Sequence, residues 1–344
     1  MNDCATIDFE TRSACSIKLA GSWRYSLDPT TEVLCLAYRL PHWVAGRVDL
    51  WHPAFPHLDL EEADCTSLYL ELFDWIEQGG LVEAHNAFFE RGIWTNISAL
   101  RDGWPMVAPK QWRCSAAKCA AHALPRALDD ACAALGLAIR KDPAGHKTMM
   151  KMNKPRKPRK AEREAGVTGL LWWEDQALFE KLFAYCKQDV RVECALSAAL
   201  PDLSLAETEV YLLDQEINER GFRLDRSAIT AALRLIAVES VRLNRELAEV
   251  TGGTVKKATQ RAQMLRWLQG QGVYLPDTQA ATLDAYLAPE SQAALPGPAR
   301  RALEIMRALG KSSTAKYEKM SQWICPDDRV HGGLLYHGAS TGRW

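Results

Sequence analysis

Two carboxylates in the first strand-like segment, Asp8 and Glu10, have a spacing that suits metal binding. Side chains alternate along a strand, so both lie on one face while Ile7 and Phe9 lie on the other. Two carboxylates this close repel each other and raise each other's pKa unless a cation lies between them. The pair predicts a divalent-metal site, although an edge strand with one solvated acidic face is an equally good interpretation.

A third carboxylate falls within an apolar helix face. Between residues 178 and 196, mainly apolar side chains recur at alternating spacings of four and three, which places them in a stripe on one face of a helix. Both Tyr185 and Asp189 lie on that stripe. A lone buried carboxylate is destabilising unless it is paired or bound to a metal. No Lys or Arg shares the stripe. We therefore expect the partner of Asp189 to come from another element.

A fourth carboxylate, Glu90, follows the strand-like run 81–84 and would lie in the first turn of a helix. Ligands of α/β proteins bind at the carboxyl ends of strands. A simpler interpretation is that Asn86 caps this helix and Glu90 complements its dipole. All-oxygen ligands select Mg²⁺ or Mn²⁺, and two such ions can clamp the attacking and leaving oxygens of a phosphodiester. The four carboxylates and Tyr185 thus indicate two-metal phosphodiester hydrolysis.

The elements that must position these residues read as an α/β region followed by a helical one. In the first region we expect strands at 4–11, 33–38 and 81–84, and helices at 67–78, 87–100, 124–137 and 175–200. The capping box from Ser204 to Glu207 opens a helix that ends at Gly221. Beyond it we expect helices at 227–250, 258–268, 278–287 and 299–309, and a strand at 333–336.

Composition excludes some classes of protein. The 344 residues suffice for two domains, and a net charge of −1 provides no global field that would attract a polyanion. There is neither a long apolar run nor a leader-like N-terminus, so we expect no membrane anchor and a cytoplasmic location. The run 151–160 holds six basic residues and two prolines. We expect a solvated mobile loop there, with a dedicated DNA grip as the less favoured alternative.

Three ordered motifs resemble those of the DEDDy 3′–5′ exonucleases: Asp8-Phe-Glu10, Asn86-Ala-Phe-Phe-Glu90 and Tyr185-Cys-Lys-Gln-Asp189. The resemblance implies a ribonuclease H-like fold with two Mg²⁺ (or Mn²⁺) ions. It implies that Asp8, Glu10 and Asp189 hold one ion, that Asp8 holds the other with Glu90 acting through water, and that Tyr185 orients the nucleophile. It also implies that Asn86 and Phe89 contact DNA, whereas Glu83 and His85 are structural. The second motif of the family usually ends in Asp, one methylene shorter than Glu90.

Three later segments resemble the N-terminal part of the phage-type family A DNA polymerases: 216–225, 310–317 and 336–344. The resemblance implies an exonuclease domain at 1–203, a helical thumb-like DNA-binding domain at 204–329 and the truncated start of a polymerase palm at 330–344. It implies that four residues grip the phosphate backbone of DNA, namely Lys311, Ser312, Ser313 and Lys316. The alternative is that Arg300, Arg301, Arg307 and Lys311 form an ordinary solvated helix face.

The implied activity is proofreading: metal-dependent hydrolysis at the single-stranded 3′ end of a primer–template during DNA replication in a phage or its bacterial host. Palm and fingers are lacking, so polymerase chemistry would need a separate palm-and-fingers chain, unless the chain is a truncated product. Two other hypotheses remain. One is a catalytically weak DNA-binding portion of a split or truncated polymerase. The other is a ribonuclease D-like RNA trimmer, against which the ending Thr341-Gly-Arg-Trp344 argues.

Overall fold

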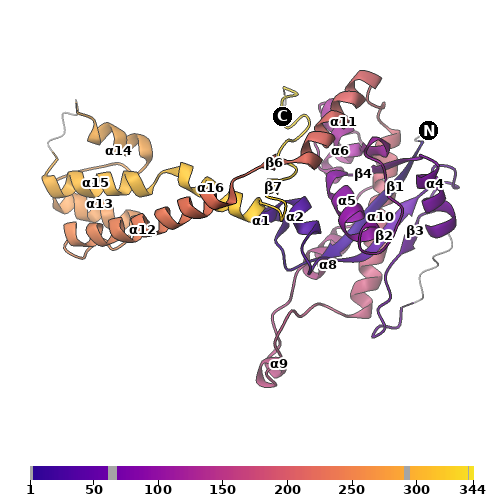
Figure 1. The fold of residues 1–344 in the computed structure, drawn as a ribbon, viewed down its shortest axis with the longest axis horizontal. Coiled ribbons are helices and arrows are strands. Elements are labelled where there is room, and N and C mark those ends of the chain that lie inside the picture. Colours follow the sequence, from indigo (N-terminus) through magenta and orange to yellow (C-terminus); the bar gives the residue numbers. More distant parts are fainter. Residues whose placement is uncertain (1–2, 61–67, 290–294, 340) are drawn as a thin grey trace. The chain divides into compact units, whose positions relative to one another are not determined.

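The computed structural model describes residues 3–60, 68–289, 295–339 and 341–344 (Figure 1). The chain divides into two compact units, Met1–Leu224 with Trp323–Trp344, and Asp225–Gln322. Helix α11 (Leu205–Arg220) belongs to the first unit, because Tyr211 packs into the main core of that unit, and the segment from 323 onward belongs to the same unit. The functional domains 1–203, 204–329 and 330–344 stay a prediction.

The first unit is built on a mixed sheet of five strands in the order β3-β2-β1-β4-β5. Its strands are β1 (Cys4–Arg12), β2 (Glu32–Arg39), β3 (Asp49–Trp51), β4 (Leu81–Ala84) and β5 (Trp112–Cys114). The central strand β1 pairs antiparallel with β2 and parallel with β4, while β2–β3 is antiparallel and β4–β5 parallel. The predicted mixed sheet flanked by helices is confirmed.

The helices of this unit lie against the sheet or extend from it. They are α1 (Ile17–Ala20), α2 (Ser22–Ser26), α4 (Asp74–Glu77), α5 (Phe88–Ile93), α6 (Ser115–Ala121), α7 (Leu128–Ala134), α8 (Pro143–Met152), α9 (Lys160–Glu164), α10 (Gln176–Ala198) and α11, with the helical turns η1 (Leu68–Phe73), η2 (Trp94–Ala99) and η3 (Pro109–Gln111). The helix predicted at 67–78 corresponds to η1 and α4, and Ser67 lies outside the described residues. The helix predicted at 124–137 is shorter than expected, because only α7 forms there.

Strand β1 separates an apolar face from an acidic one, as its alternation predicts. Ile7 and Phe9 are buried in the main core, where Phe9 packs against Trp94 and Trp104 at ring-centroid distances of 6.0 and 6.4 Å. The opposite face, which carries Asp8 and Glu10, is covered by α10, which packs across β1 and β2 (Figure 1).

Helix α10 places the second half of the acidic site. The Asp175 side chain caps it by accepting a 3.2 Å hydrogen bond from the backbone N–H of Leu178. The predicted stripe is buried, and both Tyr185 and Asp189 lie within it. Since α10 also packs against α8, it joins the sheet to the segment that precedes the basic run.

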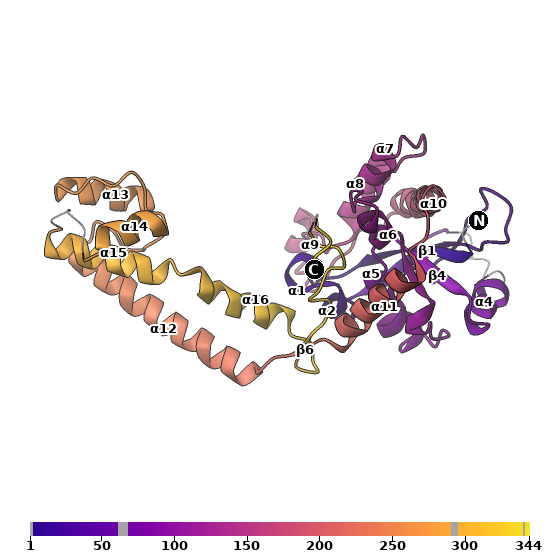
Figure 2. The ribbon, with the colours of Figure 1, turned by 90° about the horizontal axis from the view of Figure 1, so that it is seen from above.

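The C-terminal part of the first unit differs from the prediction at 333–336. These residues form no strand, and the only pairing in this part of the described chain is between β6 (Phe222–Arg223) and β7 (Arg329–Val330). The predicted strand is wrong because the side-chain amide of Asn218 takes the place of a neighbouring strand. Asn218 accepts from the Leu334 N–H at 2.8 Å and donates to the Leu334 carbonyl at 3.0 Å. Asn218 belongs to α11, which packs beside α5 through contacts of Arg91 (Figure 2).

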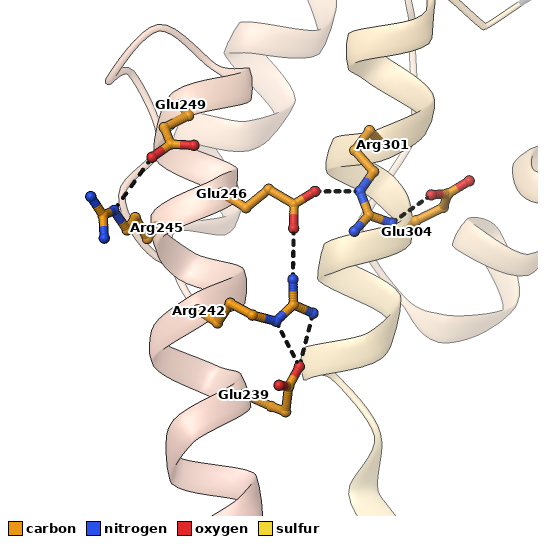
Figure 3. Close-up of polar contacts among 7 residues, drawn as sticks. All are labelled: Glu239, Arg242, Arg245, Glu246, Glu249, Arg301 and Glu304. Atoms are coloured by element: carbon orange, nitrogen blue, oxygen red, sulfur yellow. Dashed lines mark hydrogen bonds and ion pairs between the residues drawn. The ribbon is translucent and has the colours of Figure 1, made fainter.

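The second unit consists of helices wherever it is described. They are α12 (Arg226–Val250), α13 (Arg261–Gly270), α14 (Ala280–Leu287), α15 (Gly297–Leu309) and α16 (Ala315–Trp323), with the turn η4 (Ser312–Thr314). Its core gathers apolar side chains from α12 to α15, including Leu247, Leu268 and Leu303. An ion pair also connects α12 with α15, because Arg301 of α15 contacts Glu246 of α12 at 2.6 Å (Figure 3). Arg301 also pairs with Glu304 of its own helix at 3.0 Å.

None of the helices in the described part of the chain combines the length and apolar character needed to cross a membrane.

Candidate active site

All five residues predicted to be catalytic line one cavity of about 560 Å³ in the first unit: Asp8, Glu10, Glu90, Tyr185 and Asp189. They come from β1, α5 and α10, elements that are far apart in the sequence. The sheet and the helix on its acidic face therefore bring together residues that the three motifs held apart.

Three of these carboxylates are crowded. One oxygen from each of Asp8, Glu10 and Asp189 lies within 4.8 Å of the other two. Burial, and then the charge of Asp189, raise the pKa of Asp8 to about 7. Burial, and then the charge of Asp8, raise the pKa of Glu10 well above its ordinary value. Binding of a proton or a cation to these carboxylates is therefore strongly favoured in the folded protein.

Asp189 has a partner from another element, as its buried position requires. The ammonium group of Lys141 donates to Asp189 Oδ2 from the segment just before α8. Burial raises the pKa of Asp189, while the Lys141 charge lowers it without cancelling the effect. Lys141 was not predicted from the sequence. The two residues are 48 positions apart, and no spacing rule connects a lysine before one helix with an aspartate in another.

Two buried carboxylate oxygens have no hydrogen-bond partner in the described structure, Glu90 Oε2 and Asp189 Oδ1. Glu90 is 4% exposed in the first turn of α5, where burial and then the Asp8 charge raise its pKa. Buried carboxylate oxygens are normally satisfied, so orphaned ones indicate a ligand. A set of carboxylate donors with unused oxygens fits a hard cation such as Mg²⁺ or Mn²⁺.

Tyr185 lies one helical turn before Asp189 and is 1% exposed. Burial, and then the negative charge of Asp189, raise the pKa of its hydroxyl, which therefore stays protonated and can donate a hydrogen bond. A close contact with α8 fixes the ring. A Cβ atom at Gly145 would lie 2.6 Å from Tyr185 Cβ, so only glycine permits this approach.

The two predicted DNA contacts in the second motif differ in position. Phe89 lines the cavity and packs against Tyr25 with ring centroids 6.0 Å apart. Asn86 is exposed and is not among the described residues that line this cavity. It does not cap α5, because Ala87 occupies the N-cap position and Asn86 adopts a left-handed φ of 71°. Asn86 thus turns the chain from β4 into α5.

A buried polar chain lies beside the acidic site. Ser115 Oγ is 2.7 Å from Glu193 Oε1 and 2.8 Å from His85 Nδ1, while His85 Nε2 is 2.7 Å from the Arg126 carbonyl oxygen. A carbonyl only accepts, so Nε2 carries the proton. Burial lowers the pKa of His85 to about 4, which favours the neutral imidazole. Ser115 Oγ donates to Glu193 Oε1, and burial raises the pKa of that carboxyl. Each of these buried polar groups therefore has a partner inside the fold.

The remaining predicted DNA contacts lie in the second unit. Lys311, Ser313 and Lys316 are exposed at the end of α15 and in the turn and helix that follow, and the side chain of Ser312 lies outside the described residues. Arg301 and Arg307 instead form ion pairs within the unit, the latter with Asp284 at 2.5 Å. Both therefore contribute to helix packing.

The chain matches no family model. It is 30% identical over 343 residues to a DNA polymerase of Bacillus phage SP02, and the alignment covers 98% of this chain and 49% of that polymerase. The chain spans about half the length of this relative and corresponds to its N-terminal half. The predicted resemblance is confirmed to this extent: the chain is similar to the N-terminal half of one phage DNA polymerase.

Proposed function

We propose that the first unit is a metal-dependent 3′–5′ exonuclease, the proofreading part of a phage DNA polymerase with a ribonuclease H-like fold. The observation that carries the proposal is the carboxylate cluster, in which oxygens of Asp8, Glu10 and Asp189 lie within 4.8 Å of one another. Crowded, buried carboxylates are destabilising in a site that only maintains the fold, and they suit the binding of divalent cations.

Asp8, Glu10 and Asp189 would hold one ion, and Asp8 would hold a second with Glu90 nearby. When bound, the ions would lower the pKa of the attacking water and neutralise the charge that develops on the phosphate. The orphaned oxygens of Glu90 and Asp189 supply unused donor capacity for this purpose.

The residues around the carboxylates have distinct tasks. The protonated Tyr185 hydroxyl donates a hydrogen bond that orients the attacking water beside Asp189. Phe89 forms an apolar wall for the terminal nucleoside. Lys141 balances the charge of Asp189 and provides a cation at the edge of the site.

The second unit is proposed to be the thumb-like DNA-binding part of the same polymerase. Its exposed Lys311 and Lys316 supply cations for phosphate contacts that do not depend on sequence.

Incubation of the protein with 5′-labelled single-stranded DNA and RNA, in Mg²⁺ and in EDTA, tests the proposal. We expect stepwise shortening of DNA from its 3′ end in Mg²⁺ and none in EDTA. An absence of metal-dependent trimming would favour a DNA-binding module, and a clear preference for RNA would favour an RNA trimmer.

A further inference from the structure

A second cavity, of about 730 Å³, adjoins the carboxylate cavity and is strongly basic. We call it the basic groove; the residues that define it are Lys147, Lys151, Lys154, Arg156, Lys157 and Trp173. Met150, Lys154 and Pro155 line both cavities, so the basic groove and the carboxylate cavity share a wall.

The basic groove is formed by the end of helix α8 and the loop that follows it, which includes most of the run 151–160. Helix α8 ends at Met152, and Lys147, Lys151 and Lys154 follow one another at spacings of four and three. This spacing places them along one side of the helix and its continuation. The opposite side of α8 is fixed, because Gly145, Thr148 and Met152 are buried and Met152 packs in one cluster with Phe179 and Leu182 of α10.

The far side of the basic groove is also held in place. The Arg156 N–H donates to the Leu171 carbonyl at 2.8 Å, and its guanidinium donates to the Trp172 carbonyl at 2.8 Å and to Glu162 at 2.6 and 2.7 Å. The Lys151 ammonium lies 3.9 Å from the centre of the Trp173 ring. Arg156 thus organises the loop, and Trp173 positions Lys151.

The positive charge of the basic groove is available to a ligand. Lys147, Lys151 and Lys154 are exposed, and among the residues described Lys147, Lys154 and Lys157 have no ion-pair partner. At the helical rise per residue, the row of lysines from Lys147 to Lys154 is roughly 10 Å long. The basic groove can therefore contact several phosphates of an extended nucleic-acid backbone and not only a single small anion.

The neighbouring site explains why such a groove is needed. A polyanion approaching Asp8, Glu10 and Asp189 meets negative charge, and the net charge of −1 provides no long-range attraction. Binding energy must come from contacts away from the reacting bond. Single-stranded nucleic acid is held in this way, by a cationic groove that tracks the backbone.

We propose that the basic groove binds the phosphates of single-stranded DNA just upstream of the 3′-terminal phosphodiester, while that phosphodiester lies among Asp8, Glu10 and Asp189. The inference rests on the proposed exonuclease function. It assigns to Lys147, Lys151 and Lys154 the retention of the strand, without base recognition.

Fluorescence anisotropy with 5′-fluorescein-labelled oligo(dT)15 in EDTA, between 50 and 300 mM NaCl, tests the groove without requiring catalysis. The variant Lys147→Ala/Lys151→Ala/Lys154→Ala is expected to bind roughly 10- to 100-fold more weakly than the wild type. Its plot of log affinity against log salt is expected to be shallower by about 2, since each lost phosphate contact on a single strand removes about 0.7 from the slope.

A matched variant, Lys160→Ala/Arg163→Ala/Lys181→Ala, removes the same charge from exposed positions that line neither cavity. It is expected to bind within about twofold of the wild type with the same salt slope. The changed residues are exposed, so both variants should keep the wild-type melting temperature. Equal weakening in the two variants, or none in the first, would overturn the proposal.

Trimming kinetics separate this inference from the proposed function. If the wild type trims DNA, the first variant is expected to raise KM by roughly 10-fold or more with kcat little changed, and an unchanged KM would count against the groove. If the wild type trims neither DNA nor RNA in Mg²⁺, the exonuclease proposal fails, and the binding comparison in EDTA still decides whether the groove holds single-stranded DNA.

Discussion

Lys141 forms an ion pair with the buried carboxylate of Asp189, and its ammonium nitrogen lies 5.2 Å from the centre of the Tyr185 ring. The carboxylates of the site are therefore not equivalent. Asp189 has a positive partner, whereas burial and the charge of Asp189 both act against the ionised form of Asp8. This asymmetry decides how single substitutions should affect stability in the absence of metal.

Asp8→Asn is expected to stabilise the protein in EDTA, and Asp189→Asn to stabilise it less. The pKa of Asp8 is raised from 3.8 to about 7 by folding. Proton binding by Asp8 therefore stabilises the folded state fully below pH 3.8, and this stabilisation is lost as the pH rises through about 7. At pH 8, removing this charge should raise the free energy of unfolding by about 1 to 2 kcal/mol, because the side chain is partly exposed. Burial also raises the pKa of Asp189, but Asp189→Asn removes the Lys141 contact, so its gain at pH 8 should be smaller than that of Asp8→Asn.

Thermal and urea unfolding at pH 8 and pH 4 would check this pair. The Asp8→Asn gain should vanish at pH 4, and Lys141→Met, which leaves Asp189 without its cation, should destabilise the protein at pH 8. Equal stabilisation by both aspartate variants would show that the Lys141 contact does not contribute to stability.

Tyr185→Phe is expected to slow trimming by roughly 10- to 10³-fold, the range between a positioning and an acid–base role. The ring and its packing are kept, so binding of single-stranded DNA in EDTA should not change. Single-turnover rates in Mg²⁺ make the comparison. A variant as fast as the wild type would return Tyr185 to a purely structural role.

Gly145→Ala is expected to disturb the site from outside the carboxylate cluster. Its Cβ would lie 2.6 Å from Tyr185 Cβ and 2.8 Å from Asp142 Oδ2, so α8 and the tyrosine must separate. We expect a loss of about 1 to 3 kcal/mol in stability and slower trimming. The control is Gly270→Ala at the end of α13, where a Cβ has no neighbour within 4 Å and the change should be close to neutral. Equal effects of the two variants would contradict the close packing.

His85 should make the protein less stable in mild acid. Burial lowers its pKa from 6.5 to about 4, so between these values the unfolded chain binds a proton that the folded chain does not. Stability attributable to His85 is full above about pH 6.5 and falls as pH drops toward 4, by about 2 to 4 kcal/mol. His85→Gln should flatten this part of the curve of unfolding free energy against pH. Parallel curves for the two proteins would mean that His85 is not held neutral.

The parts of the site that could be predicted depend on local periodicity. Alternation along β1 places Asp8 and Glu10 opposite Ile7 and Phe9, and the stripe on α10 places Tyr185 beside Asp189. Local pattern also indicates that Asp189 needs a partner. It does not identify Lys141, because that choice depends on how the loop before α8 packs against α10.

The differences between the predicted and the observed secondary structure also come from tertiary contacts. Leu334 and its neighbours have strand-like composition, yet the Asn218 side chain from α11 occupies their backbone groups. The basic run was predicted to be a loop, and only its first two residues differ, because Lys151 and Met152 complete α8, which is held by burial of Met152. In each case a tertiary contact overrides a local preference.

We propose that the carboxylate cluster hydrolyses DNA from its 3′ end with bound divalent metal. The most direct test is the initial rate of trimming of a 5′-labelled single-stranded oligodeoxynucleotide in Mg²⁺, for the wild type and for Asp8→Asn in the same buffer. We predict stepwise release of mononucleotides by the wild type and a rate roughly 10²- to 10³-fold lower, or less, for the variant, which should remain folded. Equal rates for the two proteins, or wild-type trimming that persists in EDTA, would contradict the account.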